Sequence, residues 1–319
     1  MKGLIPNHEG LQWNRNPFRR RYSCSFPYNL RFSMAASLDQ IVAATRLRVA
    51  NSKRSSDLRK LEQEAEPHNP RGFRRSLART SRTGPAIIAE LKKASPPRGL
   101  IRAKFDPESL AGDLESAGAA ALSVLTDEEF FQGSLENLRR ASSTTRLPCL
   151  QKDFIVDEFQ LLQARASCAD AILLIAAVLS QAELVALGKK ARALGLDILC
   201  EAHNEEELHR AVDAGFDLIG VNNRDLRTFK VDVNTALRLA EMLPKDVISV
   251  AESGIDSGAD IARLRAAGYH AFLIGESLMK TESPGESLKA LLAEAERDSS
   301  TFNENSELGT GNWVHDRDS

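Results

Sequence analysis

The chain has 319 residues, of which 42% are hydrophobic, so it is long enough to bury one large core. Its formal net charge is only -2 at pH 7, which argues against a nucleic acid or another polyanion as the partner of the main body. No run of about 18 apolar residues occurs, so we expect no membrane-spanning helix and no membrane partner.

The four cysteines show neither a CxxC pair nor the spacing of metal ligands. Cys149 and Cys200 fall within apolar runs, which predicts buried free thiols in a reducing compartment. We therefore expect no disulfide framework and no structural metal.

Residues 1–36 form a basic N-terminal extension without helical or strand periodicity, which we expect to be disordered. The first 33 residues hold six basic residues against one acid. Three interpretations stay open: an organelle transit peptide, a nucleic-acid-binding arm, or an upstream start codon with the functional chain beginning at Met34. We favour the last, which predicts a cytoplasmic protein.

Residues 37–85 are predicted to form a helical extension. Ser37 is a good N-cap residue, and the residues that follow it at helical spacing are Leu38, Ile41, Val42, Thr45 and Val49. A second short helix is expected at residues 72–77, after a proline-containing linker at residues 67–70. Because a barrel closes without such helices, we expect them to cover one end of it or to build part of a ligand site.

Residues 86–297 contain eight short apolar runs separated by stretches of helical composition: 86–88, 120–125, 148–150, 171–175, 198–200, 218–221, 247–251 and 271–274. This alternation predicts an α/β fold, a (β/α)8 TIM barrel. The carboxyl ends of all the strands meet at one rim, where active sites lie. Polar residues follow most of the runs, so we expect them to converge there. Residues 298–319 are predicted to be a disordered C-terminal tail.

Glu90 and Lys92 follow the first apolar run. Because side chains alternate along a strand, both lie on the same face as Ile88. A carboxylate and an ammonium close together favour each other's charged form, and such a pair can bind an anion, orient a group or exchange protons. A buried structural ion pair is the other interpretation, but the loop that follows the strand favours a functional site.

Acid–base groups are expected at the ends of the third and fifth strands. Lys152 shares its face with Leu150 and Phe154, so burial is expected to lower its pKa and make it a general acid. A lysine in this position can instead form a Schiff base. Glu201 supplies a second carboxylate, and His203 lies on the same face, where it is expected to orient a neighbour.

An anion site is expected at the last three strands. Asn222 suits a hydroxyl, and the planar guanidinium of Arg224 suits a carboxylate or phosphate. Glycine-containing turns at Ser253, Gly254 and Gly275 let backbone N–H groups approach an anion, and a short helix after the eighth strand points its amino end inward. The predicted ligand is a small phosphorylated molecule.

Several motifs occur in order along the chain: IAELKKASP at 88–96, LSVLTD at 122–127, FQGS at 131–134, LQKDFI at 150–155, GVNNRDL at 220–226, AESGI at 251–255 and FLIGESLM at 272–279. Together they resemble the indole-3-glycerol-phosphate synthase family from about residue 38 to residue 292. The extra N-terminal helix also belongs to this resemblance. Each motif is weak alone, whereas the ordered set is specific.

The resemblance implies a carbon–carbon lyase of tryptophan biosynthesis. Such an enzyme converts 1-(2-carboxyphenylamino)-1-deoxyribulose 5-phosphate to indole-3-glycerol phosphate, CO2 and water, without a metal or organic cofactor. It implies that Lys152 is the general acid and that Glu201 transfers protons during dehydration. Glu90, Lys92 and Asn222 match further catalytic residues. The implied substrate-binding residues are Ser95, Phe131, Phe154, Arg224, Ser253, Gly254 and Gly275.

Two departures from the family pattern matter. Pro97 and Glu276 stand where relatives commonly have serine, and because a carboxylate repels a phosphate, we expect Glu276 to point away from the site.

Two other functions stay open: a different phosphate-binding barrel such as phosphoribosylanthranilate isomerase, and a non-catalytic barrel that binds a phosphorylated ligand. We expect a monofunctional protein that is a monomer or a weak homodimer.

Overall fold

The computed structural model describes residues 37–308, and their side chains through residue 298. The basic extension, with Cys24 and the alternative start at Met34, lies outside the described residues. Eight parallel strands close into a barrel with the neighbour order β1-β10-β9-β8-β7-β6-β5-β4, which confirms the predicted TIM barrel. The strands are β1 Ala86–Leu91, β4 Ala121–Leu125, β5 Cys149–Lys152, β6 Ala171–Ile175, β7 Asp197–Ala202, β8 Leu218–Asn222, β9 Ile248–Glu252 and β10 Ala271–Ile274.

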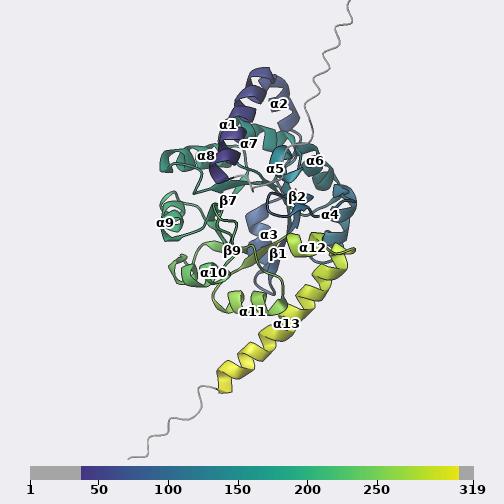
Figure 1. Cartoon of the computed structure of the whole chain (residues 1–319), viewed down its shortest axis with the longest axis vertical. Helices are drawn as coiled ribbons and strands as arrows, with labels where there is room; N and C mark the ends of the chain where they lie inside the picture. The colour runs from purple at the N-terminus through teal and green to yellow at the C-terminus, as the bar shows by residue number, and fades with distance from the viewer. Residues whose placement is uncertain (1–36, 309–319) are drawn as a thin grey trace, which may run out of the picture. The chain divides into compact units, whose positions relative to one another are not determined.

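Helices surround this barrel (Figure 1). Those that follow successive strands are α4 Pro107–Ser116, α6 Leu135–Thr144, α7 Glu158–Ala166, α8 Gln181–Ala193, α9 Glu205–Asp213, α10 Asn234–Leu239 with the 3-10 helix η1 Ala240–Met242, α11 Gly258–Ala266 and α13 Pro284–Leu308. Shorter elements lie in the connections after β1, β4 and β10: the hairpin of β2 Ala94–Ser95 and β3 Gly99–Leu100, α5 Glu128–Phe131 and α12 Glu276–Met279. Many helices begin where a side-chain oxygen caps the first turn, as at Ser134, Asp157, Ser180, Asn204 and Ser257.

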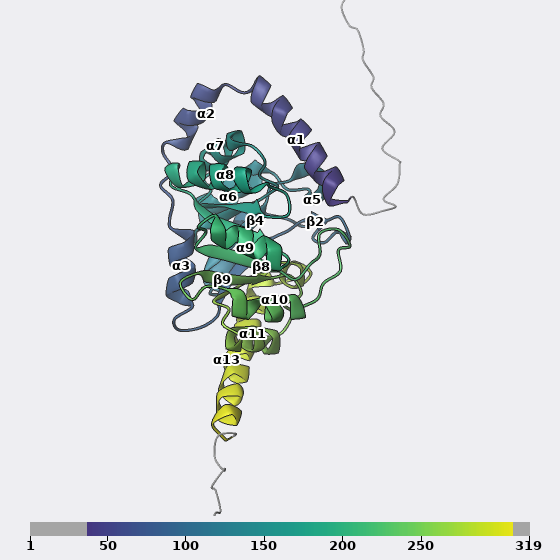
Figure 2. The same ribbon diagram turned by 90° about the vertical axis from the view of Figure 1, so that its left-hand side faces the viewer.

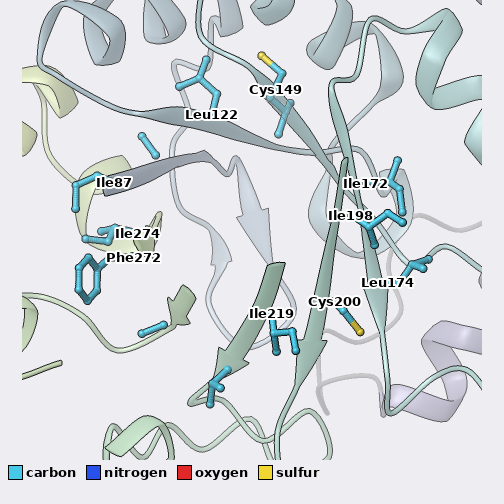
Figure 3. Packing of buried hydrophobic residues seen from close by; sticks show 14 of the residues in the cluster. Ile87, Leu122, Cys149, Ile172, Leu174, Ile198, Cys200, Ile219, Phe272 and Ile274 are labelled. Atoms are coloured by element: carbon cyan, nitrogen blue, oxygen red, sulfur yellow. The ribbon is translucent and has the colours of Figure 1, made fainter. Parts of the chain in front are cut away.

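Alternate residues of each strand belong to two different apolar layers. One set, which includes Ile87, Ile198 and Phe272, packs between the barrel and the helices (Figure 3). The other set, which includes Ile88 and Leu199, fills the barrel interior. Because the period of a strand is two, the inward-facing set continues at the carboxyl ends into polar side chains, namely Glu90, Lys152, Glu201, Asn222 and Glu252.

The N-terminal helices reach both ends of the barrel. Helix α1 (Leu38–Ser55) has Ser37 as its N-cap, as predicted, and Gln40 completes a capping box with it. Helix α3 (Phe73–Thr80) packs Phe73 and Leu77, both fully buried, against the amino-terminal end of the barrel interior. Figure 2 shows α1 and α2 over α7, with which both are in contact.

Two features of the ends differ from expectation. Helix α2 (Leu58–Ala65) was not predicted; it has only eight residues, and Ala65 is its one buried residue. Helix α13 continues past Asp298 to Leu308, so residues 298–308 are helical and the predicted tail boundary is wrong for them. No proline or glycine interrupts the chain between Gly285 and Gly309, which explains why the helix continues. No helix within residues 37–308 is long and apolar enough to cross a membrane.

Candidate active site

A cavity of about 560 Å³ opens at the carboxyl ends of the strands. Its walls contain all the site residues predicted from the sequence: Glu90, Lys92, Ser95, Phe131, Lys152, Phe154, Glu201, Asn222, Arg224, Ser253, Gly254 and Gly275. The parallel register pairs Leu125 with Lys152 and Asn222 with Glu252, so the last residues of the strands lie level with one another. The closed barrel therefore brings together residues that are far apart in the sequence.

Lys152 lies between two carboxylates. Its Nζ is 2.9 Å from Oε2 of Glu201 and 3.6 Å from Oε2 of Glu252, and both glutamate side chains are 1% exposed. Each carboxylate comes from a different strand, β7 or β9, and each continues the inward-facing set of its strand. This cluster of one ammonium and two buried carboxylates is suited to moving protons.

The electrostatics of this cluster overturn one expectation. Burial alone would lower the pKa of Lys152, but the carboxylates of Glu201, Glu252 and Glu90 together hold that pKa above its ordinary value. The predicted lowering is therefore wrong, because β7 and β9 bring two carboxylates to this lysine in addition to its apolar neighbours. Lys152 is therefore an ammonium at neutral pH.

The two carboxylates titrate in opposite directions. Burial alone would raise the pKa of Glu201, but Lys152 and His203 together hold it well below its ordinary value. Burial and the neighbouring Glu201 carboxylate raise the pKa of Glu252 to about 8, against the opposing effect of Lys152. At neutral pH Glu201 is therefore an available base, whereas Glu252 retains a proton. Neither oxygen of Glu252 has a hydrogen-bond partner among the described residues.

Glu201 is held from two further sides. Nε2 of His203 lies 3.1 Å from its Oε1, and Nδ2 of Asn222 donates a hydrogen bond to the same oxygen at 3.1 Å. Nδ1 of His203 lies 2.8 Å from Oε2 of Glu207. Burial would lower the pKa of His203, but the carboxylates of Glu201 and Glu207 together raise it to about 10. His203 is not part of the cavity wall, so the structure places it behind Glu201, where it orients the carboxylate.

The first strand contributes an ion pair as predicted. Nζ of Lys92 lies 2.5 Å from Oε1 of Glu90, and the Glu90 side chain is 4% exposed. Gly275 faces this pair so closely that a Cβ atom there would lie 2.6 Å from Oε1 of Glu90. The absence of a side chain at residue 275 therefore makes room for Glu90 as well as leaving the backbone of the β10–α12 turn accessible.

The two sides of the cavity differ in character. After β4 and β5, the rings of Phe131 and Phe154 lie 6.4 Å apart at 42° and form an apolar wall with Leu38 and Ile41 of α1. After β8, β9 and β10 lie Arg224 and the turn residues Ser253, Gly254 and Gly275. Ser253 and Gly254 both have positive φ, 66° and 71°, so the backbone turns sharply here, which glycine at residue 254 permits without strain.

Glu276 does not point away from the cavity, contrary to the expectation from sequence. It lines the cavity and pairs with Arg98 at 2.9 Å, with Lys280 at 2.5 Å and with Arg224 at 3.8 Å. A carboxylate and a phosphate alone would repel each other, but three cations surround this carboxylate. Arg98 and Lys280 were not predicted as site residues.

Two more features of the site were missed from the sequence. Glu252 follows the apolar run 247–251 but was not placed among the site residues, although it follows the same rule as Glu201. Arg48 of α1 pairs with Asp127 at 3.0 Å and Asp153 at 3.4 Å, on the turns after β4 and β5. No local signal marks Arg48, because its partners lie far along the chain.

The described residues contain neither a metal-binding cluster nor a disulfide. Within residues 37–308, no three or more His, Cys, Asp or Glu side chains are arranged to hold a metal ion. The thiols of Cys149 and Cys200 are free and buried, as predicted, and Cys168 is free and half-buried.

Known proteins identify the family. Residues 38–291 match the family model for indole-3-glycerol phosphate synthase. The chain belongs to this family. The indole-3-glycerol phosphate synthase of Koribacter versatilis is 56% identical over 259 residues, which cover 81% of this chain and 100% of that one. That of Burkholderia vietnamiensis is 46% identical over 256 residues, covering 80% and 98%. The family confirms the predicted enzyme and its class, a carbon–carbon lyase.

Solved structures agree with the fold. Thiamine phosphate pyrophosphorylase from Pyrococcus furiosus superposes with a TM-score of 0.51 at 17% identity, over 69% of this chain and 98% of that one. At this level of identity the likeness concerns the barrel alone.

Proposed function

We propose that the rim cavity converts 1-(2-carboxyphenylamino)-1-deoxyribulose 5-phosphate to indole-3-glycerol phosphate, CO2 and water. The observation that carries this proposal is the Lys152–Glu201 pair, at 2.9 Å, in a cavity with an apolar wall and a cationic wall. Ring closure needs an acid at a ketone and a base nearby, and the substrate has an aromatic ring at one end and a phosphate at the other.

The two walls orient the substrate. In the closed barrel β4 and β5 lie across from β8 and β9, so the wall of Phe131 and Phe154 faces the turns of Arg224 and Gly254. The anilino ring packs on the aromatic wall, and the phosphate binds to Arg224 and to the backbone of the turns at Ser253, Gly254 and Gly275. The ketone of the substrate then lies between the two walls, beside the Lys152 ammonium.

The first chemical step is ring closure. The aromatic carbon that carries the carboxylate attacks the ketone carbon while Lys152 gives a proton to the ketone oxygen, which forms a C–C bond and a hydroxyl. CO2 then leaves from that aromatic carbon, and the electrons of the broken bond restore the aromatic ring. Ion pairing holds Lys152 protonated and in place before the reaction.

Dehydration completes the reaction. The new hydroxyl leaves as water with a proton from an ammonium of the cavity, and Glu201 takes a proton from the adjacent carbon, which creates the indole double bond. The lowered pKa of Glu201 keeps it ionised for this role, and His203 and Asn222 hold its carboxylate in one orientation. Glu90 and Lys92 are proposed to position the substrate beside this base.

The test is turnover followed by the fluorescence of the indole product. We expect Lys152→Met to lower kcat by about 10²–10⁴-fold, which is the usual contribution of a general acid. Lys289→Met, which removes an exposed lysine of α13, is the matched control and should leave turnover unchanged. Full activity of Lys152→Met would remove the role assigned to Lys152, and no turnover by the folded wild-type protein would point to a barrel that only binds its ligand.

A second variant separates binding from chemistry. Glu201→Gln should lower kcat much more than it changes KM, because the carboxylate acts in the reaction and not in holding the substrate. A variant with a raised KM and normal kcat would contradict this.

The cellular setting proposed is the cytoplasm, with the protein as a monomer or a weak homodimer. The three free thiols of the described residues support a reducing compartment.

A further inference from the structure

Glu276 lies at the centre of a cationic cluster on the phosphate side of the cavity. Its Oε1 is 2.9 Å from Nε of Arg98 and 2.5 Å from Nζ of Lys280, and its Oε2 is 3.8 Å from Nη2 of Arg224. These cations come from three elements: the β2–β3 hairpin, the turn after α12 and the connection after β8. All four side chains line the cavity, and that of Glu276 is only 18% exposed.

The charge of this cluster calls for an anion. Three cations face one carboxylate, so the cluster is positively charged even with Glu276 ionised. Burial would raise the pKa of Glu276, but Lys280 and Arg98 hold it below its ordinary value, so the carboxylate is ionised at neutral pH. Without Glu276 the three cations would repel one another across an open cavity.

We propose that Glu276 is an internal counter-ion, which occupies Arg98, Arg224 and Lys280 until the phosphate of the substrate takes its place. This inference rests on the proposed function, because it assumes that the phosphate binds on this side of the cavity. It adds Arg98 and Lys280 to the phosphate ligands and makes Glu276 a residue that competes with the ligand.

The position of Glu276 in the backbone places its carboxylate where the phosphate is proposed to bind. Glu276 is the first residue of α12 and follows Gly275, so its carboxylate lies beside the turn that was predicted to bind the phosphate. Two anions cannot share the same cations without strong repulsion. Binding of phosphate therefore requires the Glu276 side chain to release at least one partner. The free energy needed for this release weakens the binding of phosphate.

The proposal is tested by the binding of inorganic phosphate, measured by calorimetry on the full chain. Glu276→Gln removes the competing charge and should lower the Kd of phosphate by about fivefold, the upper end for a partly exposed ion pair. Glu286→Gln makes the same charge change on α13, where Glu286 is exposed and pairs with Lys289, and should leave Kd unchanged. An unchanged or weaker affinity in Glu276→Gln would overturn the proposal.

Two further variants test the cations separately. Arg98→Met and Lys280→Met should each raise the Kd of phosphate by roughly threefold or more, because each removes a charge that the phosphate would contact. Normal phosphate affinity in both variants would overturn their assignment as ligands. Since these measurements need no turnover, a wild-type protein that bound phosphate as expected but made no indole product would refute the proposed function and leave this inference standing.

The kinetics provide an independent readout. Glu276→Gln should lower KM for the phosphorylated substrate together with the Kd of inorganic phosphate. Glu276→Asp keeps the charge and shortens the side chain, and it should retain an affinity closer to that of the wild type than Glu276→Gln does. If the two variants change phosphate affinity equally, the effect is one of shape and the counter-ion role is wrong.

Discussion

Replacing Glu252 with glutamine should change how the stability of the protein depends on pH. The carboxyl of Glu252 keeps its proton in the folded protein up to a pKa of about 8, whereas in the unfolded chain it ionises above its ordinary value of 4.5. Between these two values the folded state holds one proton more than the unfolded state, so stability decreases as pH rises. Glutamine has nearly the same shape and cannot ionise, so this loss should be absent in Glu252→Gln.

The size of the expected stability loss follows from the shift in the pKa of Glu252. At about 1.4 kcal/mol per pKa unit, a change from 4.5 to about 8 corresponds to ~5 kcal/mol lost by the wild type across this interval. Glu201 does not interfere, because its pKa is lowered and its own titration falls below the interval. His68, with a pKa raised to about 9 by Asp170 and Cys168, and His203 titrate in both proteins and cancel in the comparison.

The assay is equilibrium unfolding by urea at constant ionic strength, from pH 5 to pH 8.5, for the wild type and Glu252→Gln. The difference in unfolding free energy between them should grow steadily in favour of the variant over this range. Glu286→Gln is the control, and its difference from the wild type should stay constant. Parallel curves for the wild type and Glu252→Gln would mean that Glu252 is ionised throughout, and would refute the reasoning.

Three other substitutions test the packing. Arg48→Met should lower the free energy of unfolding by about 2–4 kcal/mol, because it leaves Asp127 and Asp153 buried without their cation; full stability by urea unfolding would count against that ion-pair network. Gly258→Ala should cost about 1–3 kcal/mol, since its Cβ would lie 2.5 Å from the backbone nitrogen of Ala295 in α13. Gly112→Ala, where a Cβ in α4 meets nothing within 4 Å, should instead stabilise by about 0.5–1 kcal/mol, and equal effects of the two glycine variants would contradict the close approach.

Most of the barrel and much of its site could be predicted from the sequence. Strand residues alternate between two faces, so the inward position of Glu90, Lys152, Glu201 and Asn222 follows from local geometry once each strand is recognised. Parallel strands in a barrel place their carboxyl ends at one rim, so these residues had to meet. Both rules are local or topological, and neither requires knowledge of any side-chain contact.

Other features depend on contacts between distant segments. Helix α2 is only eight residues long and buries only Ala65, so it depends on its contact with α7. Arg48 is identified only by the aspartates that α1 reaches after β4 and β5. Helix α13 extends past residue 298, where the composition of the chain predicted the start of a disordered tail.

By itself, the sequence determined the fold, the rim and the residue types that converge there, because strand alternation and the βα period are properties of the local chain. Only the tertiary structure decided the charge state of Lys152, the proton on Glu252 and the inward direction of Glu276. The physical reason is that a pKa and a side-chain direction depend on all the charges within a few ångström. In this barrel those charges come from strands and turns that are far apart in the chain.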